Sequence, residues 1–193
     1  MSDLTLLGFS KESWELFNSF ANWASAAGTF AAAWVALHLA NRAAKPRAAV
    51  RVGERLIIDA TSTPPHPSYL MFKIVNTGDR IIRVSQIGWS VGLWKKRHAI
   101  QLYDPALSSP LPIELSHGQE ASWLIPLNAG NEPWAQRFSQ GMLLPRRRLA
   151  IATLRAHFHT STGHTFVAKP EGELLKTLTA ECLRLSNSSS TKP

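Results

Sequence analysis

Cysteine is nearly missing from this sequence, because Cys182 is the only one among 193 residues. One thiol cannot close a disulfide within the chain, and a Cys-x-x-Cys motif for zinc or redox chemistry needs two. The sequence therefore excludes a disulfide-stapled scaffold, and its cysteine usage is typical of a reducing compartment.

The motifs of common catalytic sites are missing as well. The chain has no G-x-S-x-G turn for a serine nucleophile, no P-loop and no G-x-G-x-x-G segment. The carboxylates of Asp104, Glu114 and Glu120 are scattered, and no spacing pairs them. We therefore expect a protein that is not an enzyme and that carries no cofactor.

The segment HFHTSTGH contains the only cluster of histidines that suggests a metal site. A hairpin with a three-residue loop at 161–163 places His164 on one face and pairs the two flanking phenylalanines. His157 and His159 then lie on the other face. Because the three imidazoles point to two sides, we expect no metal site and interpret them as polar residues of an exposed sheet face.

Charged residues are missing from a long stretch near the N-terminus. Glu15 and Arg42 bound 26 residues without Asp, Glu, Lys or Arg, and no proline interrupts them. About 20 helical residues cross the hydrocarbon core of a bilayer. A cleaved signal peptide does not fit because a long acidic segment precedes the run, and a buried soluble helix usually carries a charged face. We therefore predict one transmembrane helix within residues 1–46.

The charges around this run predict its orientation. Arg42, Lys45 and Arg47 follow it, whereas the segment before it is mostly acidic. By the positive-inside rule the N-terminus lies outside and the rest of the chain is cytoplasmic. The three cations are then placed to contact anionic headgroups.

Small residues recur within the run at every fourth position. These are Ala24, Gly28, Ala32 and Ala36. Small residues at this spacing allow two helices to approach closely in lipid. We therefore expect this face to be a helix–helix contact in a homo-oligomer.

Beyond Arg47 the pattern changes to short apolar runs separated by turn residues. We predict an antiparallel, immunoglobulin-like β-sandwich over 47–170, an amphipathic helix over 171–186 and a disordered tail over 187–193. A short helix is expected at 132–140. The expected strands are 49–60, 69–75, 80–92, 95–103, two within 113–127, 147–159 and 164–169. In the strand 147–159 the residues expected to face inward are Ala150, Ala152, Leu154, Ala156 and Phe158.

Positive charge is concentrated in this larger part. From Arg42 onward the chain carries 20 Lys and Arg against 10 Asp and Glu, a net charge of +10. Two clusters stand out, and we expect each at a strand edge or turn. Such clusters prevent edge-to-edge aggregation, contact anionic lipid or bind nucleic acid beside an aromatic such as Trp94. The members of the clusters are Lys95, Lys96 and Arg97, and Arg146, Arg147 and Arg148.

Three segments, FKIVNTGDRIIRVSQIGW, LSHGQEASWLI and HFHTSTGHTFVAK, follow the apolar run and its basic exit. In this combination, over about residues 20–170, the chain resembles a group of uncharacterised small bacterial membrane-anchored proteins with an immunoglobulin-like cytoplasmic sandwich. The resemblance implies this architecture and a bacterial source, and hence a single-pass protein of the inner membrane. It brings no catalytic residues.

These features predict a membrane-anchored, non-catalytic interaction module whose sandwich binds a protein partner. Two other classes stay open. One is a membrane-perturbing effector, for example in antiphage defence, that oligomerises through its helix. The other is a soluble basic nucleic-acid-binding protein with a buried N-terminal helix.

Overall fold

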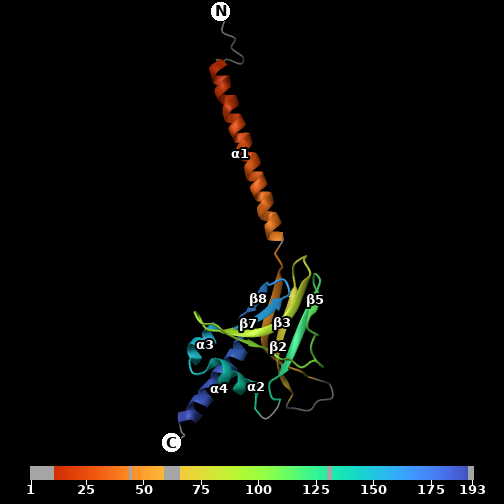
Figure 1. The fold of residues 1–193 in the computed structure, drawn as a ribbon, viewed down its shortest axis with the longest axis vertical. Helices are drawn as coiled ribbons and strands as arrows, with labels where there is room; N and C mark the ends of the chain where they lie inside the picture. The colour runs from red at the N-terminus through yellow and green to blue at the C-terminus, as the bar shows by residue number, and fades with distance from the viewer. Residues whose placement is uncertain (1–10, 44, 59–65, 130–131, 191–193) are drawn as a thin grey trace, which may run out of the picture. The chain divides into compact units, whose positions relative to one another are not determined.

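The computed structural model describes residues 11–43, 45–58, 66–129 and 132–190. The chain divides into two units, Met1–Lys45 and Pro46–Pro193. Figure 1 shows the first as one helix and the second as a set of strands with short helices.

The first unit is the helix α1 (Lys11–Ala43), which covers the predicted apolar run. Within it, Asn18–Arg42 is long and apolar enough to cross a membrane. Its large side chains are exposed, including Trp23 and Trp34. No charged or packed face distinguishes this stretch of α1, so it is a candidate membrane span.

The second unit contains two antiparallel sheets. The first sheet has the order β1 (Ala48–Leu56), β2 (Ser68–Asn76), β6 (Glu120–Pro126). The second has the order β4 (Arg97–Ile100), β3 (Ile82–Val91), β7 (Arg155–Thr160), β8 (Thr165–Ala168), and β5 (Ile113–Leu115) pairs with the start of β3. The chain is therefore mainly β outside α1, as predicted.

Aromatic side chains from the two sheets meet in one core. Phe72 of β2 makes edge contacts with Trp89 of β3 and Phe158 of β7, with ring centroids 5.0 and 5.6 Å apart. Along β2 the buried residues alternate with partly exposed ones, as the sequence pattern predicts. Burial of this apolar surface supplies the main driving force for folding of the unit.

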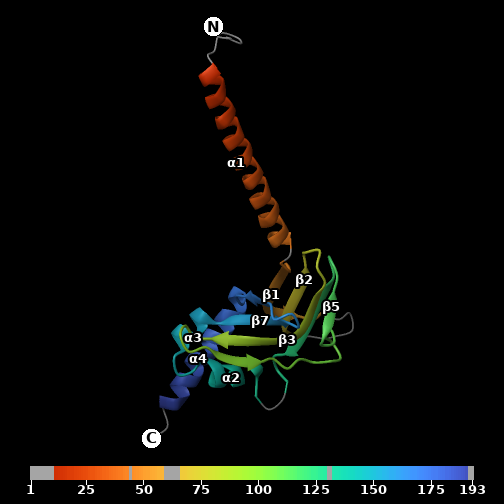
Figure 2. The same cartoon turned by 45° about the horizontal axis from the view of Figure 1, so that its top comes forward.

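The helical elements of the second unit lie together at one end of it (Figure 2). They are α2 (Trp134–Phe138), a π-helical turn η1 (Ser139–Leu143), α3 (Arg147–Thr153) and α4 (Gly172–Ser190). The helix α4 packs on α2, η1, α3 and β1. The sequence predicts an apolar face of Leu174, Leu175, Leu178, Cys182 and Leu185 for this helix. Leu174, Leu178 and Cys182 are buried, whereas Leu175 and Leu185 are partly buried.

The prediction of a strand over 147–159 was wrong in its first half. Residues Arg147–Thr153 form α3, and the strand begins at Arg155. Ala150 and Leu154 are buried as expected, but Ala152 is exposed. Ala150 and Leu154 are four positions apart, a spacing that fits one face of a helix as well as alternate positions of a strand. The apolar pattern therefore did not distinguish a helix from a strand.

Other boundaries differ by a few residues. The helix α4 continues to Ser190, so residues 187–190 are not the predicted disordered tail, and 191–193 lie outside the described residues. The strand β1 ends at Leu56 rather than at position 60. The strand β4 covers only Arg97–Ile100 of the predicted 95–103, which leaves Lys95 in the turn.

Candidate binding groove

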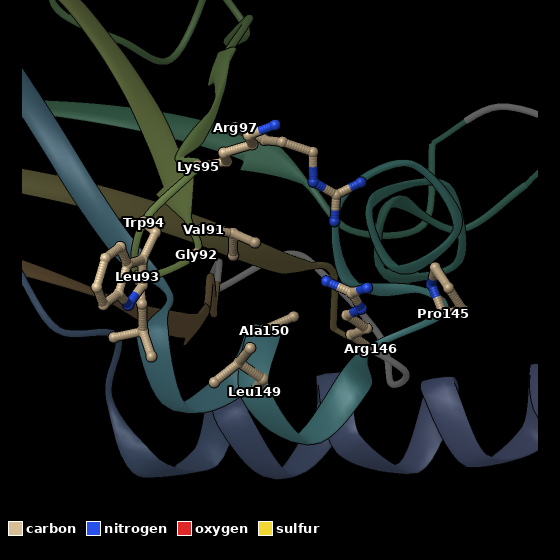
Figure 3. A pocket seen from close by; sticks show the side chains of 10 residues that line it. All are labelled: Val91, Gly92, Leu93, Trp94, Lys95, Arg97, Pro145, Arg146, Leu149 and Ala150. Atoms are coloured by element: carbon tan, nitrogen blue, oxygen red, sulfur yellow. The ribbon is translucent and has the colours of Figure 1, made fainter.

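The two basic clusters meet at one groove of the second unit. The groove, of about 780 Å³, lies between the tip of the β3–β4 hairpin and the segment that leads into α3. Figure 3 shows the side chains that line it. These are Val91, Gly92, Leu93, Trp94, Lys95, Arg97, Pro145, Arg146, Leu149 and Ala150. The structure thus brings Lys95, Arg97 and Arg146 together from distant parts of the sequence.

The hairpin tip is held in place by Gly92. Its φ of +111° lies in the region that favours glycine, and its amide donates a hydrogen bond to Oγ1 of Thr153, 3.0 Å away at the end of α3. A Cβ at this position would lie 2.6 Å from the backbone oxygen of Lys95. The tip therefore depends on glycine for its shape and on α3 for its position.

The tip presents apolar side chains to solvent. Trp94 is 97% exposed and Leu93 is 61% exposed. Across the groove Leu149 of α3 is 44% exposed, while Val91 and Ala150 are buried beneath. Isolated large apolar residues are common on protein surfaces, but a cluster of them at the rim of a groove is typical of an interaction site.

The cations of the groove are of two kinds. Arg97 donates hydrogen bonds to the carbonyl oxygens of Met142 and Gly141, the latter at 3.5 Å, near the end of η1. A guanidinium at this position satisfies carbonyls that the helical turn leaves unpaired. Lys95 and Arg146 are exposed, and within the described part of the chain they have no ion pair or side-chain hydrogen bond. Arg97 is therefore fixed by the protein backbone, whereas Lys95 and Arg146 are available to bind a ligand.

The neighbouring arginines border a second, shallower depression. It is lined by Arg146, Arg147, Arg148 and two apolar neighbours. Arg147 donates a 2.7 Å hydrogen bond to Oγ of Ser186 on α4, and Arg148 is exposed. The expectation that this cluster lies at a strand edge or turn was wrong for Arg147 and Arg148, which are in α3.

Among the residues that the structure describes, no carboxylate lines the groove or the shallow depression. Lys96 is exposed beside Lys95 in the same turn. The local charge of this surface is therefore positive without an internal counter-charge, which favours an anionic ligand.

Of the predicted membrane-flanking cations, Arg47 belongs to the second unit and does not line the groove. The backbone oxygen of Arg47 accepts hydrogen bonds from the amides of Thr77 and Gly78, at 3.0 and 3.1 Å, just before β3 begins. The strand β3 then runs ten residues to Val91 at the groove, which corresponds to roughly 30 Å at the usual rise per residue. Arg42 and Lys45 belong to the other unit.

The histidines form a cluster on the outer face of the second sheet. His157 and His159 stack at 5.7 Å, and His98 lies 6.0 Å from His157 between ring centroids. The predicted hairpin is confirmed, with Phe158 opposite Phe166. Among the described residues no group of three side chains is arranged to hold a metal ion.

Burial lowers the pKa of both His157 and His159. Repulsion from His159, His98 and Lys96 lowers the pKa of His157 further, and repulsion from His98 lowers that of His159. Nε2 of His157 lies 2.6 Å from Oγ of Ser90. The two imidazoles are therefore kept neutral near pH 7. Sequence reasoning considered His98 only as an aromatic beside Trp94 and did not place it in this cluster, although pairing of Ser90 with His98 in the β3–β4 hairpin would have done so.

The four small residues of α1, Ala24, Gly28, Ala32 and Ala36, are all exposed. Apart from its chain neighbours and the adjoining backbone of α1, no atom of the described residues lies within 4 Å of the position that a Cβ of Gly28 would take. The face that they share is therefore open to a second helix.

Comparison with known protein families and with characterised proteins gives no match to this chain. The features of the chain that bear on function are α1, the groove and the charges around both.

Proposed function

We propose that the protein is a membrane-anchored, non-catalytic interaction module that binds a protein partner at the groove. The observation that carries this proposal is that residues from both basic clusters and the exposed Trp94 line one groove. Aromatic and arginine side chains are the residues that contribute most to protein–protein binding. A site with apolar and cationic walls is suited to recognition.

The anchor in this proposal is the candidate span Asn18–Arg42. A single pass with the N-terminus outside and the second unit cytoplasmic agrees with the cations Arg42, Lys45 and Arg47 on its C-terminal side. The compartment is then the bacterial inner membrane, as the resemblance implies. In the second unit, the contacts of Phe72 with both Trp89 and Phe158 support an immunoglobulin-like sandwich of the two sheets.

Photocrosslinking in living cells tests the proposal. The full chain carries benzoylphenylalanine at position 93, at the groove, or at position 167 on β8 as a control, because Leu93 and Val167 are both exposed. We expect a protein adduct from position 93 only, in a membrane fraction that resists carbonate extraction. Extraction of the chain by carbonate would refute the anchor, and equal adducts from both positions would refute the groove.

A membrane-perturbing effector is the second candidate, and the open face around Gly28 on α1 favours it. Such an effector would assemble through that face and disturb the bilayer. Dye leakage from cells that express the full chain separates the two functions, because a passive anchor does not make the membrane permeable to the dye. Leakage that disappears in a Gly28→Leu variant would support the effector and contradict the module.

A further inference from the structure

We propose that the groove binds a protein segment in which a carboxylate side chain lies next to a large apolar side chain. This inference rests on the proposed function and specifies the chemistry of the partner. The carboxylate lies between Arg97 and Arg146, and the apolar side chain lies against Leu93, Trp94 and Leu149.

The cationic end of the groove carries the first part of this inference. Figure 3 shows the guanidinium groups of Arg97 and Arg146 on the same side of the groove, away from Leu93 and Trp94. Arg97 is held by the carbonyl of Met142, so its position does not depend on a ligand. Guanidinium groups bind carboxylates with two parallel hydrogen bonds. An anion that enters between the two arginines also relieves their mutual repulsion.

The apolar end carries the second part. Trp94 stands almost fully in solvent at the tip of the hairpin, and Leu93 and Leu149 extend its surface. A tryptophan left in water loses the free energy that burial of its large ring would give. A ligand with an apolar side chain covers this end while its charge occupies the other, so one short segment can satisfy both.

Two other anionic partners fit the groove less well. A single-stranded nucleic acid needs several aromatic side chains to stack successive bases, whereas Trp94 is the one aromatic residue among the described residues that line the groove. In the proposed function the anchor joins the second unit through the chain at Arg47, whose backbone oxygen bonds to Thr77 and Gly78 just before β3, whereas the groove lies at the other end of that strand. A short acidic and apolar protein segment requires neither a stacking platform nor proximity to lipid.

The probe for this inference is a display library of short random peptides. The bait is the full chain in nanodiscs of neutral phosphatidylcholine, so that anionic lipid does not compete. We expect the wild-type chain to enrich peptides with Asp or Glu beside Leu, Phe or Trp. A synthetic peptide from that pool should bind at least about tenfold more weakly when its acids are replaced by amides.

Exposed residues make suitable variants because their replacement leaves the core intact. We expect Trp94→Ala and Arg146→Glu each to weaken binding of the same peptide at least about tenfold. The matched controls are Leu102→Ala and Lys169→Glu, whose side chains are exposed and do not line the groove. Equal losses in variants and controls, or no enrichment of acidic and apolar peptides, would overturn the inference.

Lipid and nucleic acid are further arms of the same experiment. The Leu93→Cys variant is labelled with a polarity-sensitive dye, which Cys182 does not accept because it is fully buried. A blue shift on adding phosphatidylglycerol to the nanodiscs would identify lipid as the ligand. Binding of a single-stranded DNA that Trp94→Ala abolishes would identify nucleic acid. Either result overturns the inference.

The failure of this inference is distinct from that of the proposed function. If the protein adduct from position 93 persists in an Arg146→Glu chain, the proposed interaction module is retained, but the proposal that its partner is acidic is refuted. If no adduct forms at position 93 in the wild-type chain, the module itself fails.

Discussion

The side-chain amide of Asn76, the last residue of β2, donates a 2.8 Å hydrogen bond to the backbone oxygen of Leu115, the last residue of β5. The same nitrogen donates to the oxygen of Arg80 at 2.7 Å, and Oδ1 accepts from the amide of Gly78 at 2.9 Å. Asn76 is fully buried. One side chain thus connects the first sheet to the second and shapes the turn between β2 and β3.

Replacement of Asn76 should destabilise the second unit. Asn76→Ala removes the donor to the carbonyls of Leu115 and Arg80, while the Gly78 amide keeps its hydrogen bond to Arg47. A buried carbonyl left without a partner costs about 1–3 kcal/mol. Asn76→Asp should cost more, because a buried carboxylate then faces two carbonyl oxygens. Denaturant unfolding of the full chain in detergent measures both losses. The exposed Asn128 provides the control, and an Asn76→Ala chain as stable as Asn128→Ala would contradict the prediction.

The hairpin tip should depend on Gly92 more than other turns depend on their glycines. Gly92→Ala combines a positive φ with a Cβ that meets the backbone oxygen of Lys95. Gly163 also has a positive φ, but its Cβ would meet nothing. We expect about 1–2 kcal/mol of destabilisation for Gly163→Ala and a larger loss for Gly92→Ala. Ligand binding at the groove should also be lost in Gly92→Ala but kept in Gly163→Ala. Equal destabilisation by the two changes would contradict the prediction, because it would show that the Cβ at position 92 avoids the Lys95 oxygen at no cost in free energy.

The elements that depend on local pattern were predicted, and those that depend on register or docking were not. The alternation in β2 and the loop after Thr160 follow from neighbouring residues, and both are confirmed. The helix α3 was mistaken for a strand because Ala150 and Leu154 satisfy both periods.

The groove itself lay beyond local reasoning. It exists because the amide of Gly92 meets Thr153, a contact between residues 61 positions apart in sequence. Each basic cluster was visible in the sequence, but no local signal indicates that the two would meet. The approach of His98 to His157 depends in the same way on the register of β4 against β3.

The stability of the second unit should fall in mild acid because of His157 and His159. Their pKa values in the folded chain lie below the ordinary 6.5, so the unfolded chain binds more protons as the pH drops. The stabilisation from the neutral imidazoles is complete above about pH 6.5 and is lost as the pH falls through the lowered pKa values.

Thermal unfolding of the full chain as a function of pH measures this effect. A chain with both His157→Gln and His159→Gln should show a flatter dependence between neutral and mildly acidic pH. Leu102 is exposed and has no titratable group, so Leu102→Gln should leave the slope unchanged. Parallel curves for the double variant and the wild type would assign the slope to other groups.

Self-association through α1 should depend on the face that carries Gly28. A leucine there fills the open space and separates two helices that would otherwise meet at Ala24, Ala32 and Ala36. We expect Gly28→Leu to weaken association by about 1–2 kcal/mol, or about tenfold, in crosslinking experiments in the membrane. Ala26 lies on the opposite side of the helix, about 160° away, so Ala26→Leu should crosslink as the wild type does. A Gly28→Leu chain that crosslinks like Ala26→Leu would leave α1 as an anchor without a helix partner, and the effector function would lose its support.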